Sequence, residues 1–250
     1  MNEKTKIAVI IPAFNEEEAI GPLLQELKKE LPEVDIVVIN DGSSDGTEQI
    51  ARNEDVNLLN LPCNLGVGSA IQAGYKLTFE KGYDIVVRID GDGQHPPEEI
   101  SKLIAAITAE DVDLIIGSRY IEKSSFGNTT LRSFGIKLLA LFLSIICRAK
   151  ITDPTSGFWV IKRNLLYYFC NDYPYEYPEP EAIALMRRHG YSYKEIPVRF
   201  RARIAGKSTI RGWGSVYYMI KVGLALIVDR IRPINPRFEK SKLRSFNGSA

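Results

Sequence analysis

The sequence predicts an α/β protein built on a doubly wound, mostly parallel sheet. Short aliphatic runs alternate with segments whose apolar residues repeat at helical spacing, and four consecutive runs end in polar or glycine-bearing loops. In such a sheet the carboxyl ends of the strands share one edge, where α/β proteins bind their ligands. The 250 residues, 45% of them hydrophobic, suit one large domain or one domain with a C-terminal appendage.

Five strands alternate with helices along the first half of the chain. Apolar, largely β-branched runs predict strands over residues 7–11, 35–39, 57–61, 85–89 and 113–117. Helical spacing predicts a helix after each of the first four strands, with ends near residues 31, 51, 80 and 107. This order is typical of parallel β-α-β units.

Two segments of the second half are more apolar than ordinary surface helices: residues 134–147 and 215–229. Both are too short to span a bilayer, which takes about 20 apolar residues. They suit core or a dimer interface on one interpretation, and helices lying at a membrane surface on the other. Basic residues after the second segment would assist binding to anionic lipid: Arg230, Arg232, Arg237, Lys240, Lys242 and Arg244. We expect a catalytic domain over 1–212 and a helix with a basic tail over 213–250, without a transmembrane span.

Composition excludes some classes of function. The formal net charge of +1 gives no global signal for binding nucleic acid. Three cysteines (Cys63, Cys147, Cys170) lack metal-ligand or paired spacing, and the N-terminus does not resemble a signal peptide. These features predict reduced thiols and a cytoplasmic protein.

Asp90 and Asp92 are the main candidate site residues. They follow an apolar strand directly, and Gly91 and Gly93 let the backbone come close to a ligand. Two like charges this close repel, so a shared cation is the simplest way to hold them together. Carboxylate oxygens suit Mg²⁺ or Mn²⁺, and Mg²⁺ at such sites usually also binds substrate phosphates. Asp-x-Asp alone is most often a solvated turn, and the preceding strand and the following Gln94-His95-Pro96-Pro97 make this instance stronger.

The second half adds basic and acidic candidates. Arg199, Arg201 and Arg203 alternate with apolar residues, which in a strand would put all three on one face. The face is either solvated or a cationic wall for phosphate groups. Prolines at 174, 178 and 180 predict an extended approach to a helix over 182–189, with Glu179 and Glu181 before or in its first turn.

Several motifs together resemble those of the family 2 inverting glycosyltransferases of the GT-A fold. The landmarks are Pro12-Ala13-Phe14-Asn15-Glu16, Asp41-Gly42-Ser43, Asn64 with Gly66, Gly68 and Ala70, and Asp90 with Asp92. Gln94-His95-Pro96-Pro97-Glu98 is similar to the branch of dolichyl- and polyprenyl-phosphate sugar synthases, which includes dolichol-phosphate mannose synthases. Further matches are Ser118-Arg119, Arg132, Asp153, Ser156-Gly157-Phe158, Arg203, Gly206 and Ser208. The resemblance covers roughly residues 6–209.

Three features depart from the family pattern. Asn40-Asp41 stands where relatives carry two acids, and Ser208-Thr209 stands where many carry Ser-Lys, with Lys207 displaced. The C-terminal transmembrane helices of some relatives are not expected here, which raises the question of how a lipid acceptor is reached.

The resemblance implies a metal-dependent hexosyltransferase and assigns roles to residues. Asp90, Asp92 and Gln94 would hold Mg²⁺ or Mn²⁺ on the diphosphate, where the metal stabilises the leaving nucleoside diphosphate. The nucleotide sugar would be bound by Pro12, Ala13, Asn15, Glu16, Asp41, Asn64, Gly66, Gly68, Asp90, Gly91, Asp153, Glu179, Glu181 and Arg203. Lys207 and Ser208 would contact the acceptor phosphate. Which of Glu179 and Glu181 approaches the sugar stays open.

The acceptor decides the mechanism. A sugar hydroxyl needs a general base, whereas a lipid phosphate arrives largely ionised and needs only positioning. Arginine positions anions through its planar fork, and Arg119 and Arg132 flank the predicted site. We therefore expect transfer from a nucleoside-diphosphate sugar to a polyprenyl phosphate by an enzyme on the inner face of the membrane, with Asp90, Asp92, Arg119 and Arg132 as its catalytic residues.

Other functions remain open. A family 2 enzyme acting on a sugar hydroxyl in polysaccharide assembly would need Asp153, Glu179 or Glu181 as the base. A nucleotidyltransferase would carry a glycine-rich basic loop where this chain has Asn15 and Glu16, which argues against it. A non-catalytic nucleotide-sugar-binding scaffold is the alternative from another class. The sugar, the nucleotide base, the oligomeric state and a membrane protein partner are open, with UDP-linked donors preferred over GDP-mannose.

Overall fold

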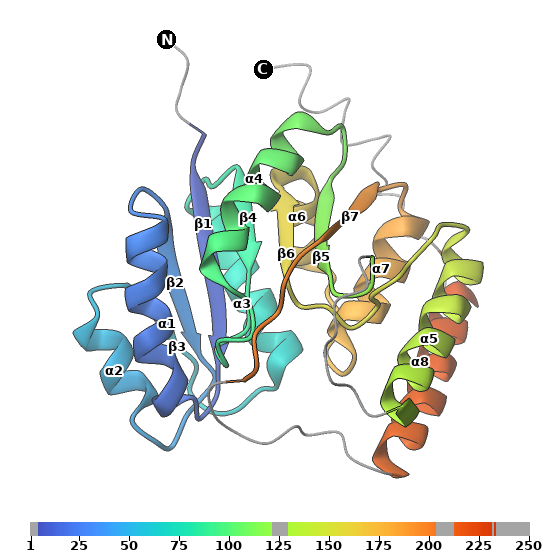
Figure 1. Ribbon diagram of the computed structural model, residues 1–250, viewed down its shortest axis with the longest axis horizontal. Coiled ribbons are helices and arrows are strands. Elements are labelled where there is room, and N and C mark those ends of the chain that lie inside the picture. Colours follow the sequence, from blue (N-terminus) through green and yellow to red (C-terminus); the bar gives the residue numbers. More distant parts are fainter. Residues whose placement is uncertain (1–4, 122–129, 204–212, 232, 234–250) are drawn as a thin grey trace.

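The computed structural model describes residues 5–121, 130–203, 213–231 and 233, and of residues 130–134 and 213–220 it describes the backbone alone. Within the described residues, seven strands form one sheet in the order β3-β2-β1-β4-β6-β5-β7 (Figure 1). The strands are β1 (Ile7–Ala13), β2 (Asp35–Asn40), β3 (Asn57–Asn60), β4 (Ile85–Arg88), β5 (Leu114–Ser118), β6 (Trp159–Lys162) and β7 (Tyr193–Pro197). Strand β6 runs antiparallel to β4 and β5, and the other described pairs are parallel. The predicted α/β class and mostly parallel sheet are confirmed.

Helices cover both faces of the sheet because its strands are apolar on both sides. On one face lie α1 (Glu17–Glu30), α2 (Thr47–Asn53) and α4 (Ile100–Ala109), the last preceded by a 3₁₀ turn (Pro97–Glu99). On the other lie α3 (Val67–Glu80), α6 (Arg163–Asn171) and α7 (Pro178–Arg188). In β1, Val9 and Ile11 pack toward the first face and Ile10 toward the second, as the strand period of two requires.

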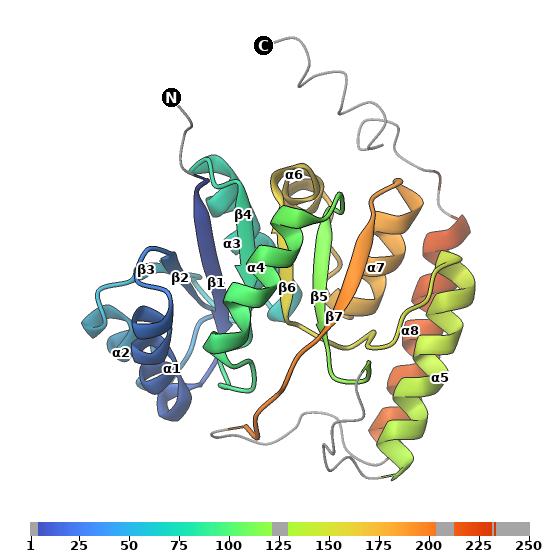
Figure 2. The same ribbon diagram turned by 45° about the horizontal axis from the view of Figure 1, so that its top comes forward.

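Two long helices form an outer layer beside α7. They are α5 (Thr130–Cys147) and α8 (Trp213–Ile231), which lie side by side in both ribbon views (Figures 1 and 2). Leu139, Leu143, Val222 and Leu226 are buried in the core, so each helix has one face turned inward. None of the helices in the described part of the chain is long and apolar enough to cross a membrane. Both predicted apolar helices are confirmed, and α5 begins four residues earlier than expected.

Two local predictions were wrong. Helix α7 begins at Pro178, so Pro178 and Pro180 lie in its first turn instead of in an extended approach. Proline is tolerated there because the first amides of a helix have no partner within it. Strand β7 ends at Pro197, so Arg199, Arg201 and Arg203 do not share the face of a strand. Their segment instead leaves the sheet and crosses its lower edge, orange in Figures 1 and 2.

Candidate active site

The carboxyl ends of β1, β2, β4 and β5 meet at one edge of the sheet, at the bottom of Figure 1. The segment after β7 is tied to this edge by two backbone hydrogen bonds. Val198 N–H donates to Ser118 O (3.1 Å), and Arg201 N–H donates to Gln94 O (3.0 Å). Arg203 thereby reaches the carboxylates that follow β4. The convergence predicted from the loops is present in the structure.

Asp90 and Asp92 occupy different environments. Asp92 is buried, with Oδ1 accepting Gln94 N–H (2.9 Å) and Oδ2 paired with Arg203 Nη2 (2.8 Å), whereas the Asp90 side chain is 39% exposed. Burial, with Asp90 nearby, raises the pKa of Asp92. Partial burial also opposes ionisation of Asp90, but His95 and then Arg88, Arg119 and Arg203 outweigh it and lower the pKa of that carboxyl. The site thus holds one carboxyl group that ionises readily, Asp90, beside one whose ionised form is disfavoured, Asp92.

Glu16 adds a third carboxyl to this end of the sheet. Burial, followed by the charge of Asp92, raises the pKa of Glu16 to about 7. Among the residues with described side chains, no three acidic, histidine or cysteine groups converge closely enough to hold a metal ion by themselves. A divalent ion at Asp90 and Asp92 would therefore complete its oxygen ligands with water or a diphosphate. The carboxylate set fits such an ion, because a cation would stabilise the ionised forms of Asp92 and Glu16, which burial and then neighbouring carboxylates disfavour.

The loops after β1 and β2 are fastened to each other. Asn15 has a positive φ of 54°, and its N–H donates to Ser43 Oγ (3.0 Å) while its Oδ1 accepts Ser44 N–H (2.9 Å). Asp41 is 3% exposed, and its two oxygens accept Leu65 N–H (2.8 Å) and Gly66 N–H (3.0 Å). Asp41 therefore braces the loop before α3, a role that sequence reasoning did not include.

The two glycines at the start of α3 have different surroundings. Gly66 has a φ of 89°, and its N–H is bonded to Asp41 and Asn64. A Cβ on Gly68 would lie 2.4 Å from Pro174 O and 2.5 Å from the carbonyl oxygen of Tyr175. Close backbone packing thus accounts for Gly68.

Arg119 and Asp153 form a buried bidentate pair. Arg119 Nε and Nη2 donate to the two carboxylate oxygens of Asp153, each at 2.7 Å, and Nη2 also donates to Thr155 Oγ1 (2.9 Å). Asp153 is fully buried, and the Arg119 side chain is 16% exposed. These two candidates, assigned to the acceptor and the sugar, contact each other.

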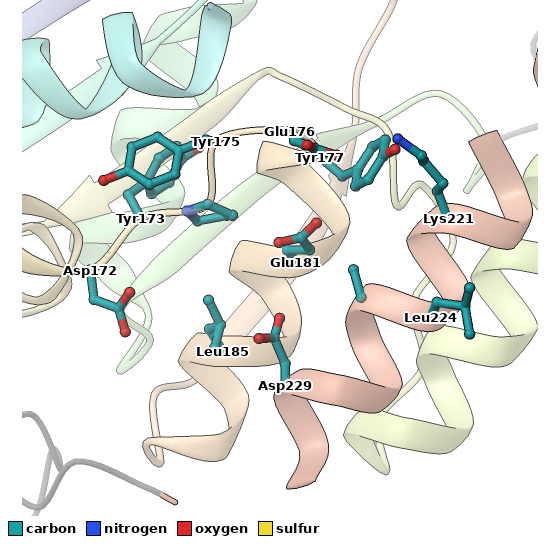
Figure 3. A pocket seen from close by; sticks show the side chains of 12 residues that line it. Asp172, Tyr173, Tyr175, Glu176, Tyr177, Glu181, Leu185, Lys221, Leu224 and Asp229 are labelled. Carbon is teal, nitrogen blue, oxygen red and sulfur yellow. The ribbon is translucent and has the colours of Figure 1, made fainter. Parts of the chain in front are cut away.

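Glu179 and Glu181 lie in separate places. Glu179 pairs with Arg88, whose Nη2 is 2.5 Å from Oε1. Glu181 instead lines, together with Asp229 of α8, a pocket of about 420 Å³ bounded by α7, α8 and residues 172–177 (Figure 3). Burial, with the charges of Asp229 and Glu176, raises the pKa of Glu181 to about 7. Of the two, Glu179 is the one connected to the Asp90 end of the site.

Comparison with known proteins agrees with this geometry. The family described as Glycosyl transferase family 2 matches residues 8–169. The chain belongs to this family. This glycosyltransferase is 30% identical to a polyprenol monophosphomannose synthase of Mycolicibacterium smegmatis over 90% of each chain. It is also 30% identical to an undecaprenyl-phosphate mannosyltransferase of Micrococcus luteus, over 83% of this chain and 88% of the relative.

The fold of the glycosyltransferase has solved counterparts. Glucosyl-3-phosphoglycerate synthase of Mycobacterium tuberculosis, solved with Mn²⁺, UDP-glucose and phosphoglyceric acid, superposes with a TM-score of 0.70. The identity is 22%, and the match covers 92% of this chain and 82% of that one. The resemblance to family 2 and to the GT-A fold is thus confirmed.

Some predicted site residues lie outside the described part of the structure. Lys207 and Ser208 belong to the undescribed range 204–212, and for Arg132 the backbone alone is described, in the first turn of α5. Their assignment to the acceptor phosphate stays a prediction.

No site role was predicted for two residues of the glycosyltransferase that surround Asp90. They are Arg88, 1% exposed, and His95, 2% exposed. A signal for Arg88 was available, because a lone charge inside an aliphatic strand is expensive to bury unless it is paired. His95 was named only as part of the Gln94-His95-Pro96-Pro97 motif. Its ring is packed between Phe158 and Phe200, with centroids 5.0 and 4.9 Å away.

Proposed function

We propose that this glycosyltransferase moves one hexose, with inversion, from a nucleoside-diphosphate sugar to a polyprenyl phosphate. Relatives named for polyprenyl phosphates cover most of the chain, which supports this acceptor. The proposed donor end is the sheet edge with Glu16, Asn15 and the loop braced by Asp41. Phosphate groups would lie between Asp90, Asp92 and Arg203.

Asp90 and Asp92, with Gln94 beside them, would hold Mg²⁺ or Mn²⁺. When bound, the metal neutralises charge that develops on the departing diphosphate. Arg203 adds a guanidinium at the same place, since its Nη2 already lies 2.8 Å from Asp92 Oδ2. A diphosphate entering the site would offer Arg203 an alternative partner of the same charge sign, with geometry suited to its planar fork.

One observation carries the choice of acceptor: none of the three carboxylates proposed as a general base is placed to act as one. Asp153 is fully buried against Arg119, Glu179 is paired with Arg88, and Glu181 faces α8. A hydroxyl acceptor needs such a base, and an ionised phosphate does not. The engagement of these acids therefore favours a phosphate acceptor over a sugar hydroxyl.

The α5–α8 surface supports a membrane location for the acceptor. Leu138, Leu141 and Ile145 of α5 are 51–67% exposed on one helical face. On α8, Leu224, Ile227, Val228 and Ile231 are 47–78% exposed, and both helices lie at the outside of the molecule (Figure 2). A two-helix apolar face of this kind can lie in the interface of a bilayer. We propose that this face rests on the cytoplasmic side of the membrane.

The decisive experiment is transfer of labelled sugar into an organic-extractable product. Purified protein is given UDP-glucose, UDP-N-acetylglucosamine or GDP-mannose with Mn²⁺ or Mg²⁺, with and without undecaprenyl phosphate. Label in the lipid phase with one donor is expected, and Asp92→Ala or chelation should abolish it. Asp111→Ala, an exposed aspartate before β5 at the opposite sheet edge, is the matched control and should retain transfer. Metal-dependent donor hydrolysis without lipid product from any donor would contradict a polyprenyl phosphate acceptor.

Flotation with liposomes tests the membrane face separately. Leu141→Lys and Ile145→Lys should each reduce flotation on vesicles that contain anionic lipid. Leu65→Lys replaces an apolar side chain that is 51% exposed in the loop before α3, and it should float like the wild type. Equal flotation of all three folded variants, or a dimer in solution that Leu141→Lys dissociates, would refute the membrane assignment.

A further inference from the structure

Arg88 is an unusual residue for its position. It ends β4, an otherwise aliphatic strand buried along its whole length, and it is itself 1% exposed. Its guanidinium lies near the Trp159 ring of the neighbouring strand, 5.7 Å from the centroid. An arginine buried this deeply is stable only with compensating partners.

Those partners come from a distant part of the chain. Arg88 Nη2 lies 2.5 Å from Glu179 Oε1, and Nη1 donates to Tyr173 Oη at 3.3 Å. Glu179 stands in the first turn of α7, and its side chain is 17% exposed. The pair therefore fastens the N-terminus of α7 to the end of β4.

The same nitrogen of Arg88 also faces the active site. Arg88 Nη2 lies 3.5 Å from Asp90 Oδ1, longer than a hydrogen bond. On the other side, His95 Nδ1 accepts Asp90 N–H (2.9 Å), and His95 Nε2 lies 3.9 Å from Asp90 Oδ2. Asp90 thus has Arg88 beside one carboxylate oxygen and His95 beside the other, while its side chain stays 39% exposed.

Gly157 completes this enclosure. A Cβ on Gly157 would lie 2.8 Å from Asp90 Oδ1, 2.9 Å from Asp90 Oδ2 and 3.1 Å from Arg88 Nη2. Any side chain at this position would push the carboxylate out of its present orientation. The backbone at Gly157 therefore forms a wall against which Asp90 is set.

We propose that the buried Arg88–Glu179 ion pair is a positioning pair for Asp90, an inference that rests on the proposed role of Asp90 at the metal and donor. The guanidinium of Arg88 forms its short contact with Glu179 and stays 3.5 Å from Asp90 Oδ1. At that distance Arg88 orients the Asp90 carboxylate without forming a hydrogen bond to it. Loss of Glu179 would let Arg88 close onto Asp90 and compete with the metal. Loss of Arg88 would remove the group that orients the Asp90 carboxylate, and it would leave Glu179 without its cationic partner.

Three variants and one control separate positioning from a merely structural role. The variants are Glu179→Gln, Arg88→Met and the double variant Arg88→Met/Glu179→Met. The control is Arg163→Met: this half-buried arginine donates to Tyr83 O (2.8 Å) at the opposite edge of the sheet. The readouts are the thermal midpoint, direct Mn²⁺ binding with and without UDP or GDP, and the Mn²⁺ concentration that half-saturates donor hydrolysis.

Both single variants are expected to bind Mn²⁺ about 10–100-fold more weakly, the usual effect of losing a group that orients a metal ligand. The double variant should recover the thermal midpoint, because apolar residues can replace a buried pair, but not the Mn²⁺ affinity. Arg163→Met should lower the midpoint and leave Mn²⁺ affinity unchanged. Wild-type Mn²⁺ affinity in the double variant would overturn the proposal and make the pair structural alone.

Gly157→Ala tests the orientation of Asp90 without altering any charge. It should also raise the Mn²⁺ concentration needed for half-saturation, and wild-type affinity in this variant would count against the proposal. Failure of the proposed function has a different signature. In that case the wild type itself shows no metal-dependent turnover of any donor, and the positioning role falls with it.

Discussion

Replacing Arg119 by methionine should lower stability sharply, because it leaves the carboxylate of Asp153 buried without its cation. Asp153 is fully buried and would lose two contacts of 2.7 Å, keeping the backbone N–H of residue 119 at 3.1 Å. Removing one partner of a buried ion pair costs about 3–5 kcal/mol. Since Arg119 is 16% exposed, we expect the lower end, about 3 kcal/mol. For a chain of this size that loss is about 6–12 °C in the thermal midpoint.

The assay is thermal and urea unfolding of Arg119→Met beside a matched exposed pair. Arg52 contacts Glu48 at 2.7 Å, but their side chains are 56% and 42% exposed, so Arg52→Met should cost about 0.5 kcal/mol or less. The double variant Arg119→Met/Asp153→Asn should recover part of the loss, since the buried charge is gone. If Arg119→Met unfolds no earlier than Arg52→Met, Arg119 does not hold Asp153 in solution, and its guanidinium is available to an acceptor phosphate.

Three further predictions concern stability. Glu181 has a pKa of about 7 in the fold against 4.5 ordinarily, so its contribution is full below about pH 4.5 and is lost as the pH rises to about 7. The free energy of unfolding, measured in urea, should therefore fall between pH 5 and pH 8 in the wild type. In Glu181→Gln this fall should be about 1–2 kcal/mol smaller, after allowance for solvent screening. Gly68→Ala should cost about 1–3 kcal/mol by collision with Pro174 O, whereas Gly135→Ala in α5, with open space around it, should be neutral or stabilising by calorimetry. Asp41→Asn replaces one of two acceptor oxygens with a donor that faces Leu65 N–H or Gly66 N–H. The free energy of unfolding in urea should therefore fall by about 1–3 kcal/mol. An unchanged urea midpoint would mean that other contacts hold the loop.

The parallel strands could be predicted because a strand buried on both faces is an uninterrupted aliphatic run. Strands β1 to β5 were predicted with ends within two residues of those observed, such as 7–11 against Ile7–Ala13, but β7, which pairs in parallel with β5, was not. Strand β6 escaped prediction because Trp159–Lys162 is four residues long, and its insertion between β4 and β5 is decided by tertiary packing. No local pattern specifies which strands a short segment will join.

The candidate site also has a part that could be predicted from the sequence and a part that could not. Asp90 and Asp92 are adjacent in sequence and follow their strand directly, so their meeting at the sheet edge was predictable. The partner of Arg88 was not, because Glu179 lies 91 residues away. Nor could the sequence separate Glu179 from Glu181, since residues two apart in a helix point in different directions and the direction depends on where α7 begins. That start, at Pro178, was the part of the prediction that was wrong.

The antiparallel strand β6 also constrains how the chain can fold as it is synthesised. Strands β4 and β5 do not pair with each other; each pairs with β6, through Val86↔Ile161 and Ile115↔Val160 for example. Until residue 162 has left the ribosome, both strands carry an edge with unpaired backbone groups, which is the kind of surface that recruits other nascent chains. A fragment ending near residue 120 would keep these open edges permanently. The shortest self-sufficient unit of this sheet therefore extends past β6, well beyond β4 and β5, the strands that Asp90 and Arg119 follow.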